Sequence, residues 1–382
     1  MPDPLFYPVK SYNTNTRKNL EAGVKVAKKG KVACFLLAGG VGSRLGIYGA
    51  KGCFPITPIQ KKSFFQQIFE RIKAYEEAFH CKVEIGVMLS SSTEKSVKKF
   101  FQSKDYFGLK KSQVTFFVQN NLAYLDEKLK PVKVEGKIVK AGDGNGGAIQ
   151  VLQNSNWLKK LSRKKVEYLH VVPIDNALLD PLNLAMTGIL SLKKWDALIA
   201  ATKRGKKDKN FGALVQKEGK VTVIDYMELP KTYLEKPLEK VFPYINISHY
   251  CLKLSWLNSV LLEAELPIHW VKKKIPNRKN WVWKREMFFF DLFSYSDKIG
   301  AVYLPKDKYF YPLKEPADLS KVQKALQKRD RKLLGALGLQ KLAKGPYELS
   351  SEFFYLTEEL KEVISHRKLP SQGYVSLKTL EG

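Results

Sequence analysis

The distribution of apolar and polar residues along the first part of the chain predicts a buried strand followed by an amphipathic helix. Residues 31–38 form a short, almost entirely apolar stretch that ends at glycines, which is typical of a strand buried in a parallel sheet. Over residues 64–79, apolar side chains recur at helical spacing, at Phe65, Ile68, Phe69, Ile72 and Tyr75. That spacing gives the helix one apolar face, which we expect to pack on the strand.

The same alternation continues toward the middle of the chain. Further strands are predicted over residues 82–90, 114–119, 166–174 and 197–202, and a basic helix over residues 93–102. Strands that alternate with helices of this length are typical of βαβ units. The pattern therefore predicts an α/β fold with a doubly wound, mostly parallel sheet.

Later segments depart from this alternation. Residues 211–215 and 221–226 flank a short Glu-Gly-Lys turn, which predicts a β-hairpin inserted into the α/β core. Residues 244–254 are expected to form another strand, and the apolar residues 288–293 are expected to be buried. The sequence contains no internal repeat.

Composition divides the 382-residue chain into three parts. Residues 1–30 are polar and lysine-rich and are interpreted as an N-terminal arm. Residues 31–318 carry the alternating pattern and are interpreted as the main α/β domain. Residues 319–382 are interpreted as a short C-terminal segment of short helices rich in lysine and leucine, and the sequence leaves open whether it is a separate domain.

The chain is strongly basic, because 66 lysine and arginine residues against 37 acidic residues give a net charge of +29. The four cysteines include no Cys-x-x-Cys pair and the histidines form no metal-binding pattern, so we expect reduced thiols and no histidine-based metal site. No apolar stretch approaches the ~20 residues that span a bilayer, and the start shows no signal-peptide pattern. These features predict a soluble, cytoplasmic protein without membrane contact.

The first predicted strand leads directly into a glycine-rich loop that carries two cations. The loop runs Ala38-Gly39-Gly40-Val41-Gly42-Ser43-Arg44-Leu45-Gly46 and is followed by Lys51-Gly52. Glycines after a strand let backbone N–H groups approach an anion, and Arg44 and Lys51 are placed to bind a polyphosphate. Leu45 excludes a dinucleotide-binding Gly-x-Gly-x-x-Gly loop, and Gly52 excludes a Walker A loop. The alternative is a loop whose glycines serve chain geometry only.

Two further clusters indicate the same kind of ligand. Residues 143–147, Asp-Gly-Asn-Gly-Gly, precede a helical stretch and suit close approach of the backbone to a base or a phosphate, although such glycines are also ordinary turn signals. Asp175 and Asn176 follow a predicted strand, at the edge where open α/β sheets bind ligands. A carboxylate there is a natural ligand for Mg²⁺ on a nucleotide phosphate, and the alternative is a helix N-cap.

In this order, the three clusters resemble the UDP-sugar pyrophosphorylase family, and most of all its UDP-N-acetylhexosamine pyrophosphorylase branch. The family's Leu-x-Gly-Gly-x-Gly-Thr-x-Leu-Gly, Pro-Lys-Gly, Asp-Gly-Asn-Gly-Gly and Val-Asp-Asn motifs are matched by residues 37–46, 50–52, 143–147 and 174–176. Segments 272–276, 286–291 and 312–314 also match in the right order, so the resemblance covers roughly residues 31–318.

The resemblance implies a Rossmann-like, glycosyltransferase-A-like nucleotidyltransferase with Mg²⁺ as cofactor. It would join UTP and a sugar 1-phosphate into UDP-N-acetylglucosamine or UDP-glucose, releasing pyrophosphate after in-line attack on the α-phosphorus. By position in the matched motifs, the catalytic residues would be Arg44, Lys51 and Lys314, and the metal ligand Asp175. The nucleotide-binding residues would be Ala38, Gly39, Gly40, Gln119 and Gly146, and the sugar-binding residues Asn246 and Glu286.

Departures from the family pattern are Ala50 in place of proline, Ser43 in place of threonine, and Pro-Tyr-Ile-Asn-Ile over residues 243–247 in place of Asn-Ala-Gly-Asn-Ile. The last change lies beside the sugar and leaves its identity open. The alternative interpretation of Lys314 is a solvated surface lysine, and the alternative interpretation of Glu286 is a member of a structural salt bridge. Trp281 and Trp283 are interpreted as core or interface residues.

Two other classes of protein are weighed against the enzyme. Basic runs such as 203–207 and 328–332 would suit a nucleic-acid-binding protein, but they are dispersed and lack interleaved aromatic residues, so solvated faces are favoured. A nucleotide-sugar-binding protein without catalysis would require Arg44, Lys51 or Asp175 to be misplaced. The oligomeric state is not determined by the sequence.

Overall fold

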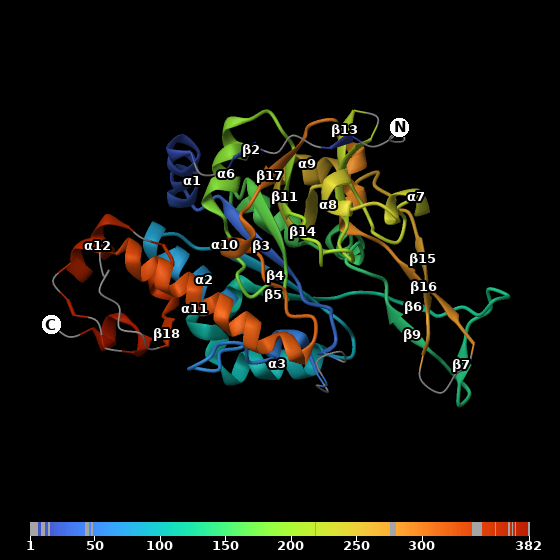
Figure 1. The fold of residues 1–382 in the computed structure, drawn as a ribbon, viewed down its shortest axis with the longest axis horizontal. Coiled ribbons are helices and arrows are strands. Elements are labelled where there is room, and N and C mark those ends of the chain that lie inside the picture. The colour runs from blue at the N-terminus through green and yellow to red at the C-terminus, as the bar shows by residue number, and fades with distance from the viewer. Residues whose placement is uncertain are drawn as a thin grey trace.

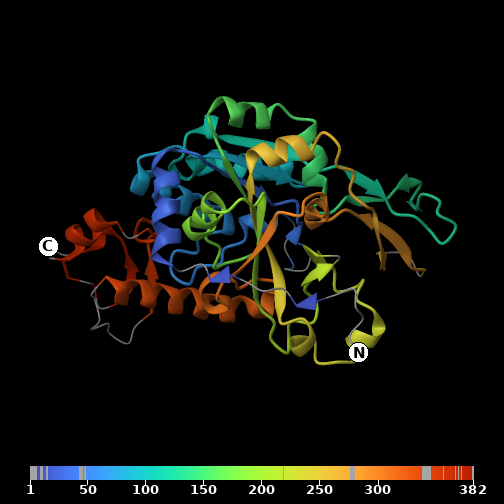
Figure 2. The ribbon, with the colours of Figure 1, turned by 90° about the horizontal axis from the view of Figure 1, so that it is seen from above.

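The computed structural model describes residues 7–8, 12–13, 16–42, 46, 49–217, 219–275, 280–337, 346–355, 357–365, 367–368, 370 and 372–380. In these ranges a large twisted sheet forms the centre of the molecule, with helices packed around it (Figure 1, Figure 2). The α/β fold that the sequence predicts is confirmed.

The main path of the sheet runs in the order β2–β17–β11–β14–β10–β3–β4–β5. The bounds in that order are Tyr12–Asn13, Ile299–Tyr303, Ala197–Lys203, Tyr244–Lys253, Tyr168–Pro173, Val32–Leu37, Glu84–Leu89 and Val114–Val118. Strand β14 is antiparallel to both of its neighbours, β10 and β11, whereas the other neighbouring pairs along this path are parallel. The sheet is therefore mostly parallel, as predicted.

Side chains of β3 divide between two hydrophobic cores. Cys34 and Leu36 pack with helices α2 (Phe64–Phe79) and α6 (Leu184–Leu192). Ala33 and Phe35 pack on the other face with α4 (Gly147–Gln153), α5 (Trp157–Arg163) and α9 (Leu254–Val260). Because alternate residues of a strand face opposite sides, a continuous apolar stretch requires cover on both faces. The strand and the helix predicted from the first apolar pattern are both confirmed.

The inserted hairpin is also confirmed. It consists of β12 (Ala213–Lys217) and β13 (Lys220–Ile224), and β12 pairs in addition with β1 (Tyr7–Pro8) and β14. The remaining helices of the core are α3 (Glu94–Ser103), α7 (Lys231–Leu234), α8 (Leu238–Val241) and α10 (Lys306–Tyr309). The 3₁₀ segments of this part are η2 (Lys51–Cys53), η3 (Asp105–Gly108), η4 (Lys111–Gln113), η5 (Phe289–Tyr295) and η6 (Pro316–Asp318). Among the helices described, none is long and apolar enough to cross a membrane.

Part of the predicted N-terminal arm is a helix, α1 (Arg17–Lys28), which the sequence pattern did not indicate. It begins after Thr16, whose hydroxyl accepts a hydrogen bond from the Asn19 N–H, and it packs against α6. Gly23 allows this close contact, because a Cβ at that position would lie only 2.0 Å from the carbonyl oxygen of Leu184. The helix is missed from sequence because it buries a narrow stripe of small residues rather than large apolar ones.

Three pairs of short strands, β6–β9, β7–β8 and β15–β16, project from the core as an arm, which both views show (Figure 1, Figure 2). The bounds are Asn121–Ala123 for β6, Lys133–Val134 for β7, Lys137–Ile138 for β8, Lys140–Gly142 for β9, His269–Lys273 for β15 and Val282–Glu286 for β16. Backbone hydrogen bonds of 3.0 and 2.7 Å between Leu125 and Trp283 join residues 121–142 to the β15–β16 hairpin. We call residues 121–142, 269–275 and 280–286 the hairpin arm.

The C-terminal segment begins with one long helix, α11 (Leu319–Ala336), where the sequence analysis predicts short ones. A parallel pair of strands and a further helix follow, namely β18 (Tyr347–Leu349), β19 (Gly373–Val375) and α12 (Glu358–Ser365), with 3₁₀ turns η7 (Ser351–Phe353) and η8 (Leu377–Thr379). These elements enclose a small core of their own around Leu334, Tyr347 and Val375. The domain boundary at residue 318 stays a prediction.

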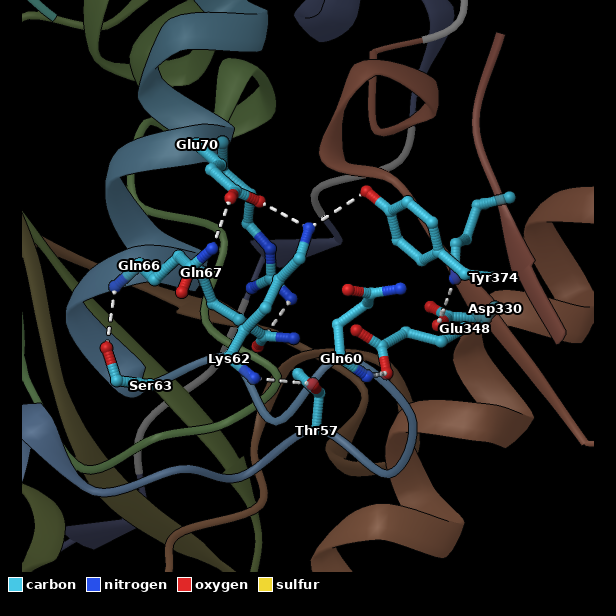
Figure 3. A network of polar contacts seen from close by, with 12 residues as sticks. Thr57, Gln60, Lys62, Ser63, Gln66, Gln67, Glu70, Asp330, Glu348 and Tyr374 are labelled. Atoms are coloured by element: carbon cyan, nitrogen blue, oxygen red, sulfur yellow. Dashed lines mark hydrogen bonds and ion pairs between the residues drawn. The ribbon is translucent and has the colours of Figure 1, made fainter. Parts of the chain in front are cut away.

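A polar network holds this segment against the loop between η2 and α2 (Figure 3). The Glu348 carboxylate accepts the N–H groups of Ile59 and Gln60 at 2.7 and 2.9 Å. The Lys62 ammonium donates to Glu70 at 2.7 Å and to the Tyr374 hydroxyl at 3.0 Å. The loop that follows the glycine-rich segment is therefore fixed by the C-terminal segment.

Candidate functional site

A cavity of about 350 Å³ opens at the carboxyl ends of the neighbouring parallel strands β3 and β10. Open α/β sheets bind ligands at this edge. The lining residues are Leu37, Gly40, Val41, Gly42, Lys51, Asn145, Pro173, Ile174, Asp175, Ser248 and Lys314. Four of the predicted site residues, from three distant parts of the chain, therefore share one cavity.

The glycine-rich loop leaves the end of β3 and returns to it, which brings Lys51 back to the sheet edge. The Gly42 N–H donates to the Gly49 carbonyl at 2.8 Å, and the Lys51 N–H donates to the Gly40 carbonyl at 3.3 Å. The two ends of the loop thus lie side by side, with the lysine at the mouth of the cavity. Arg44, the other predicted cation, lies outside the residues that the structure describes.

Lys51 and Asp175 both line the cavity and form an ion pair. The Lys51 Nζ lies 3.2 Å from the Asp175 Oδ2, and the two side chains are 14% and 36% exposed. In the described ranges, no group of three histidine, cysteine or acidic residues could hold a metal ion by itself. A cation at Asp175 would need phosphate oxygens and waters as further ligands, which is the usual binding mode of Mg²⁺. Because the Asp175 carboxylate is paired with Lys51 and belongs to no group of three possible ligands among the described residues, Mg²⁺ at this position stays a prediction.

Asn176 fixes the segment that leads to Lys314. Its Nδ2 donates to the Tyr309 carbonyl at 2.7 Å, and its Oδ1 accepts the Tyr311 N–H at 2.9 Å. The Leu313 N–H donates to the Asp175 carbonyl at 3.0 Å. Asn176 is 1% exposed, so these bonds are shielded from water. One buried amide therefore ties residues more than a hundred positions apart to the same strand end.

Lys314 follows this tie and lines the cavity with Lys51 and Asp175. Its ammonium lies 3.6 Å from the centroid of the Phe211 ring, a cation–π contact that orients the side chain. The helix N-cap alternative for Asp175 is wrong, because the next helix, α6, begins after Asn183, whose side chain caps it. The strand-end position of Asp175 thus serves the cavity rather than a helix.

A second group of predicted residues gathers at the ends of β3 and β5. Ala38 and Gly39 follow β3, and Gln119 follows β5. A Cβ at Gly39 would lie 2.3 Å from the Gln119 Oε1, and a Cβ at Gly142 would lie 1.7 Å from its Nε2. The Gln119 side-chain amide therefore packs against two glycines. Its Nε2 is a hydrogen-bond donor and its Oε1 an acceptor. Gly142 was missed, because this role depends on a contact between distant segments.

Gly146 has both backbone groups engaged within the protein. Its N–H donates to the Met287 carbonyl at 2.9 Å, and its carbonyl accepts the Ile149 N–H at 2.9 Å. The structure brings the neighbouring Asn145 to the cavity instead, with its Oδ1 accepting the Phe289 N–H at 2.8 Å. A base-reading role for Gly146 stays a prediction.

Asp143 lies beneath this loop with no solvent exposure. Its two carboxylate oxygens have no hydrogen-bond partner among the described residues. Burial raises the pKa of Asp143 to about 6. Gly147 is required above it, because a Cβ there would lie 2.2 Å from the Asp143 Oδ1. The Asp-Gly-Asn-Gly-Gly motif thus packs a buried acid under a bare loop.

The two predicted sugar ligands are not among the residues that line the cavity. Asn246 is buried in β14, where its Nδ2 donates to the Tyr250 hydroxyl and its Oδ1 accepts the Ser248 N–H, both at 2.9 Å. Glu286, at the end of β16, pairs with Lys284. Ser248 does line the cavity and was missed; its φ of 55° is unusual for a residue other than glycine, and no sequence signal indicates it.

A charged cluster lies where the hairpin arm joins the core. His269 hydrogen-bonds through Nε2 to the Asp291 Oδ2 at 2.8 Å and through Nδ1 to Glu228. These bonds, first that to Asp291, raise the pKa of His269 to about 10, so the ring is an imidazolium at neutral pH. The ring also lies 4.6 Å from that of Phe288. Sequence reasoning assigned no function to this histidine.

The family model for UTP–glucose-1-phosphate uridylyltransferase matches residues 6–368. The chain belongs to this family. Among curated members it is 30% identical over 338 residues to the UDP-N-acetylglucosamine pyrophosphorylase of Saccharomyces cerevisiae, covering 80% of this chain and 70% of the yeast protein. It is 29% identical over 314 residues to UDP-N-acetylglucosamine diphosphorylase 2 of Arabidopsis thaliana.

The uridylyltransferase family likeness extends to solved structures. A protein of Entamoeba histolytica, provisionally assigned as a UDP-N-acetylglucosamine pyrophosphorylase, is 26% identical with a TM-score of 0.79, covering 94% of this chain and 96% of that one. The chain spans 62% of the length of the Arabidopsis relative. The resemblance read from the ordered motifs is thus confirmed at the level of the family.

Proposed function

We propose that this protein is a UTP-dependent sugar-1-phosphate uridylyltransferase that forms a UDP-sugar and pyrophosphate. The observation that supports it is the meeting of Lys51, Asp175 and Lys314 in one cavity at the sheet edge. N-acetylglucosamine 1-phosphate is the preferred sugar substrate in this proposal, because the names of the curated relatives refer to UDP-N-acetylglucosamine. Glucose 1-phosphate is the alternative, since the family name refers to it.

In the proposed reaction, an oxygen of the sugar 1-phosphate attacks the α-phosphorus of UTP. The bond from that phosphorus to the bridging oxygen breaks, and pyrophosphate leaves with the electron pair. Lys51, together with Arg44, would neutralise the leaving pyrophosphate, and Lys314 would hold the sugar phosphate beside the α-phosphate. Positioning and charge stabilisation suffice, because phosphoryl-type transfer needs no nucleophile from the protein.

The uracil is proposed to lie at the other end of the site. Gln119 would pair with its polar edge, while Ala38, Gly39 and Gly40 would leave room for the ring and the first phosphate. Asn246 and Glu286 remain the proposed sugar ligands, with Ser248 as an additional candidate from the cavity wall. A cytoplasmic location also stays a prediction.

Mg²⁺ is part of the proposal, with Asp175 as its protein ligand. When bound, Mg²⁺ supplies Lewis-acid neutralisation of the phosphate oxygens. We expect Asp175→Asn to lower activity and to raise the Mg²⁺ concentration needed for half-maximal rate, because a neutral amide is a weaker ligand than a carboxylate. A Mg²⁺ titration of the wild type and the variant measures this. Wild-type activity of Asp175→Asn at limiting Mg²⁺ would contradict the assignment.

A pyrophosphate-release assay tests the function as a whole. UTP, CTP, ATP and dTTP are each combined with N-acetylglucosamine 1-phosphate and with glucose 1-phosphate. We expect release with UTP and one or both sugars, and much less with the other nucleotides. Release with none of the pairs would reject the proposal, and release with another nucleotide would reject the assigned base site.

A further inference from the structure

One face of the β15–β16 hairpin alternates tryptophans with cations. Residues opposite each other in an antiparallel pair share a face, and so do residues two apart on one strand. In the observed register Trp270 lies opposite Arg285 and Lys272 lies opposite Trp283. Lys274 and Trp281 lie just beyond the paired residues and are in cation–π contact with each other. We call these six residues the tryptophan–cation face. It holds half of the six tryptophans of the chain.

Most of this face is exposed to solvent, with Trp283 and Arg285 half-buried, whereas the opposite face of the hairpin contains buried valines. Trp270 is 45% and Trp281 is 50% exposed. On the opposite face, Val271 and Val282 are 5% and 1% exposed. The hairpin is therefore held in place by its other side, and its fold does not require the exposed rings.

The cations lie over the rings rather than apart from them. The Lys272 ammonium is 5.1 Å from the centroid of Trp283, and the Lys274 ammonium is 5.1 Å from that of Trp281. Trp270 and Trp283 meet edge to face, with ring centroids 6.2 Å apart. Flat rings and positive charges thus alternate at one level along the ribbon.

A partner that suits this pattern also alternates flat rings with charges of opposite sign. We propose that the tryptophan–cation face binds single-stranded nucleic acid, whose bases would stack on the tryptophans while its phosphates contact the lysines and the arginine. Charge supports this choice, because residues 121–142 and 269–286 together contain 12 basic and 4 acidic residues, a larger excess than in the chain as a whole. No residue of the tryptophan–cation face lines the cavity at the ends of β3 and β10, so this proposal does not depend on the proposed function.

An anionic membrane fits the face less well. Segments that insert into a bilayer separate an apolar surface from a basic one, because charged groups stay at the level of the headgroups. Here each ring has a cation as its neighbour, and the sequence between the two strands contains two more cations. The basic runs 203–207 and 328–332 lack interleaved aromatic residues, whereas in the arm aromatic and basic residues alternate across two paired strands.

Fluorescence anisotropy with the full-length protein tests the proposal. The probe is a fluorescein-labelled oligouridylate of about 12 nucleotides, and a DNA duplex of the same length serves as comparison. We expect the single strand to bind about tenfold more tightly than the duplex, to be released by salt and to quench tryptophan fluorescence. Trp270→Ala with Trp281→Ala, which leaves net charge unchanged, should weaken binding about tenfold.

A matched pair of charge reversals separates the face from general electrostatics. Lys272→Glu with Lys274→Glu should weaken binding at least about tenfold, whereas Lys206→Glu with Lys207→Glu, an equal change on another exposed basic surface, should have a small effect. The proposal would be overturned if the protein does not bind the oligonucleotide, or if both charge-reversal pairs weaken binding equally. It would also be overturned if the tryptophan variant binds like the wild type, or if the protein binds phosphatidylserine vesicles more tightly than the oligonucleotide. Circular dichroism confirms that each variant is folded, and Lys272→Gln with Lys274→Gln replaces a charge reversal that fails to fold.

Discussion

At the scale of single residues, the glycine-rich loop shows why two small residues flank Lys51. A Cβ at Gly52 would lie 2.3 Å from the Phe65 ring, so glycine alone lets η2 press against α2. Ala50 stands where the family pattern has proline, and its φ of −74° already matches the proline range. The hydrogen bonds that close the loop use the Gly49 carbonyl and the Lys51 N–H, and the Ala50 N–H takes no part in them. The backbone is thus prepared for proline at position 50.

We expect Ala50→Pro to stabilise the protein by about 0.4–1 kcal/mol, because proline reduces the freedom of the unfolded chain without straining the folded loop. Urea unfolding measures the free energy, with the wild type as reference. Gly52→Ala is the opposite case and should destabilise, because its Cβ has no room beside Phe65. A destabilised proline variant would show that the loop requires the Ala50 N–H or a different backbone geometry.

Lys51 carries the strongest prediction at this scale. Lys51→Ala should lower the turnover of pyrophosphate release about 10²–10³-fold, because it removes a cation from the leaving group. Lys99→Ala, at an exposed position on α3, is the control and should leave turnover unchanged. Melting curves establish that both variants fold. Comparable turnover in Lys51→Ala and the wild type would remove the lysine from the mechanism.

At the scale of elements, the local pattern of apolar residues predicts strands and helices that are continuous in sequence. It does not predict short strands that depend on pairing with distant segments. Residues 31–38 and 64–79 carry their periodicity within themselves, so β3 and α2 could be read directly. The arm could not, because its strands are short, polar and joined through Leu125 and Trp283, far apart in the chain. In the site, Lys51, Asp175 and Lys314 were predicted through motifs, whereas Gly142 and Ser248 act through tertiary contacts that leave no local signal.

A chain of hydrogen bonds links β14, β10 and α6 in the core. The Thr187 hydroxyl donates to the Asn183 carbonyl at 3.3 Å, so it accepts the Nε2–H of His170 at 2.8 Å. The Nδ1 of His170 is then the acceptor for the Nε2–H of His249, at 3.0 Å. Burial lowers the pKa of His249 to about 3, and burial together with the neighbouring His249 lowers the pKa of His170 well below its ordinary value. Both rings are therefore neutral in the folded protein.

This pair should make the protein less stable in mild acid. The unfolded histidines bind protons below pH ~6.5 while the folded ones do not, so stability is fully present above that pH and falls as the pH drops through it. Each ring contributes at most about 1.4 kcal/mol per pH unit. Urea unfolding between about pH 5 and pH 8 measures the slope.

The double variant His170→Leu, His249→Leu isolates the effect of the pair from that of Asp143, whose raised pKa acts with the opposite sign. We expect the variant to have a flatter slope below pH ~6.5. His80→Asn, at an exposed position at the end of α2, should retain the slope of the wild type. If the free energy of unfolding has the same pH dependence in the double variant and the wild type, the histidine pair does not cause the loss of stability in acid.

At the scale of the whole molecule, the C-terminal segment contacts the loop between η2 and α2 through side chains that include Glu348 and Tyr374. Glu348 on β18 is 2% exposed, and its carboxylate binds two successive N–H groups of the loop between η2 and α2. That loop continues directly from Lys51 through η2, and its base is closed by the Ile56 N–H to the Lys62 carbonyl at 2.8 Å. The C-terminal segment therefore supports the element that carries Lys51.

We expect Glu348→Ala to lower kcat/KM for UTP about tenfold, although Glu348 touches no substrate, because small displacements of a charged group are costly in phosphoryl transfer. Glu348→Gln keeps an acceptor oxygen for the two N–H groups and should restore most of the loss. The decisive comparison is with Glu352→Ala, since the Glu352 carboxylate accepts the Leu377 N–H at 2.6 Å within the C-terminal segment itself. That variant should weaken the segment without moving the loop. Equal losses in Glu348→Ala and Glu352→Ala, with no rescue by glutamine, would mean that the segment contributes general stability rather than placement of Lys51.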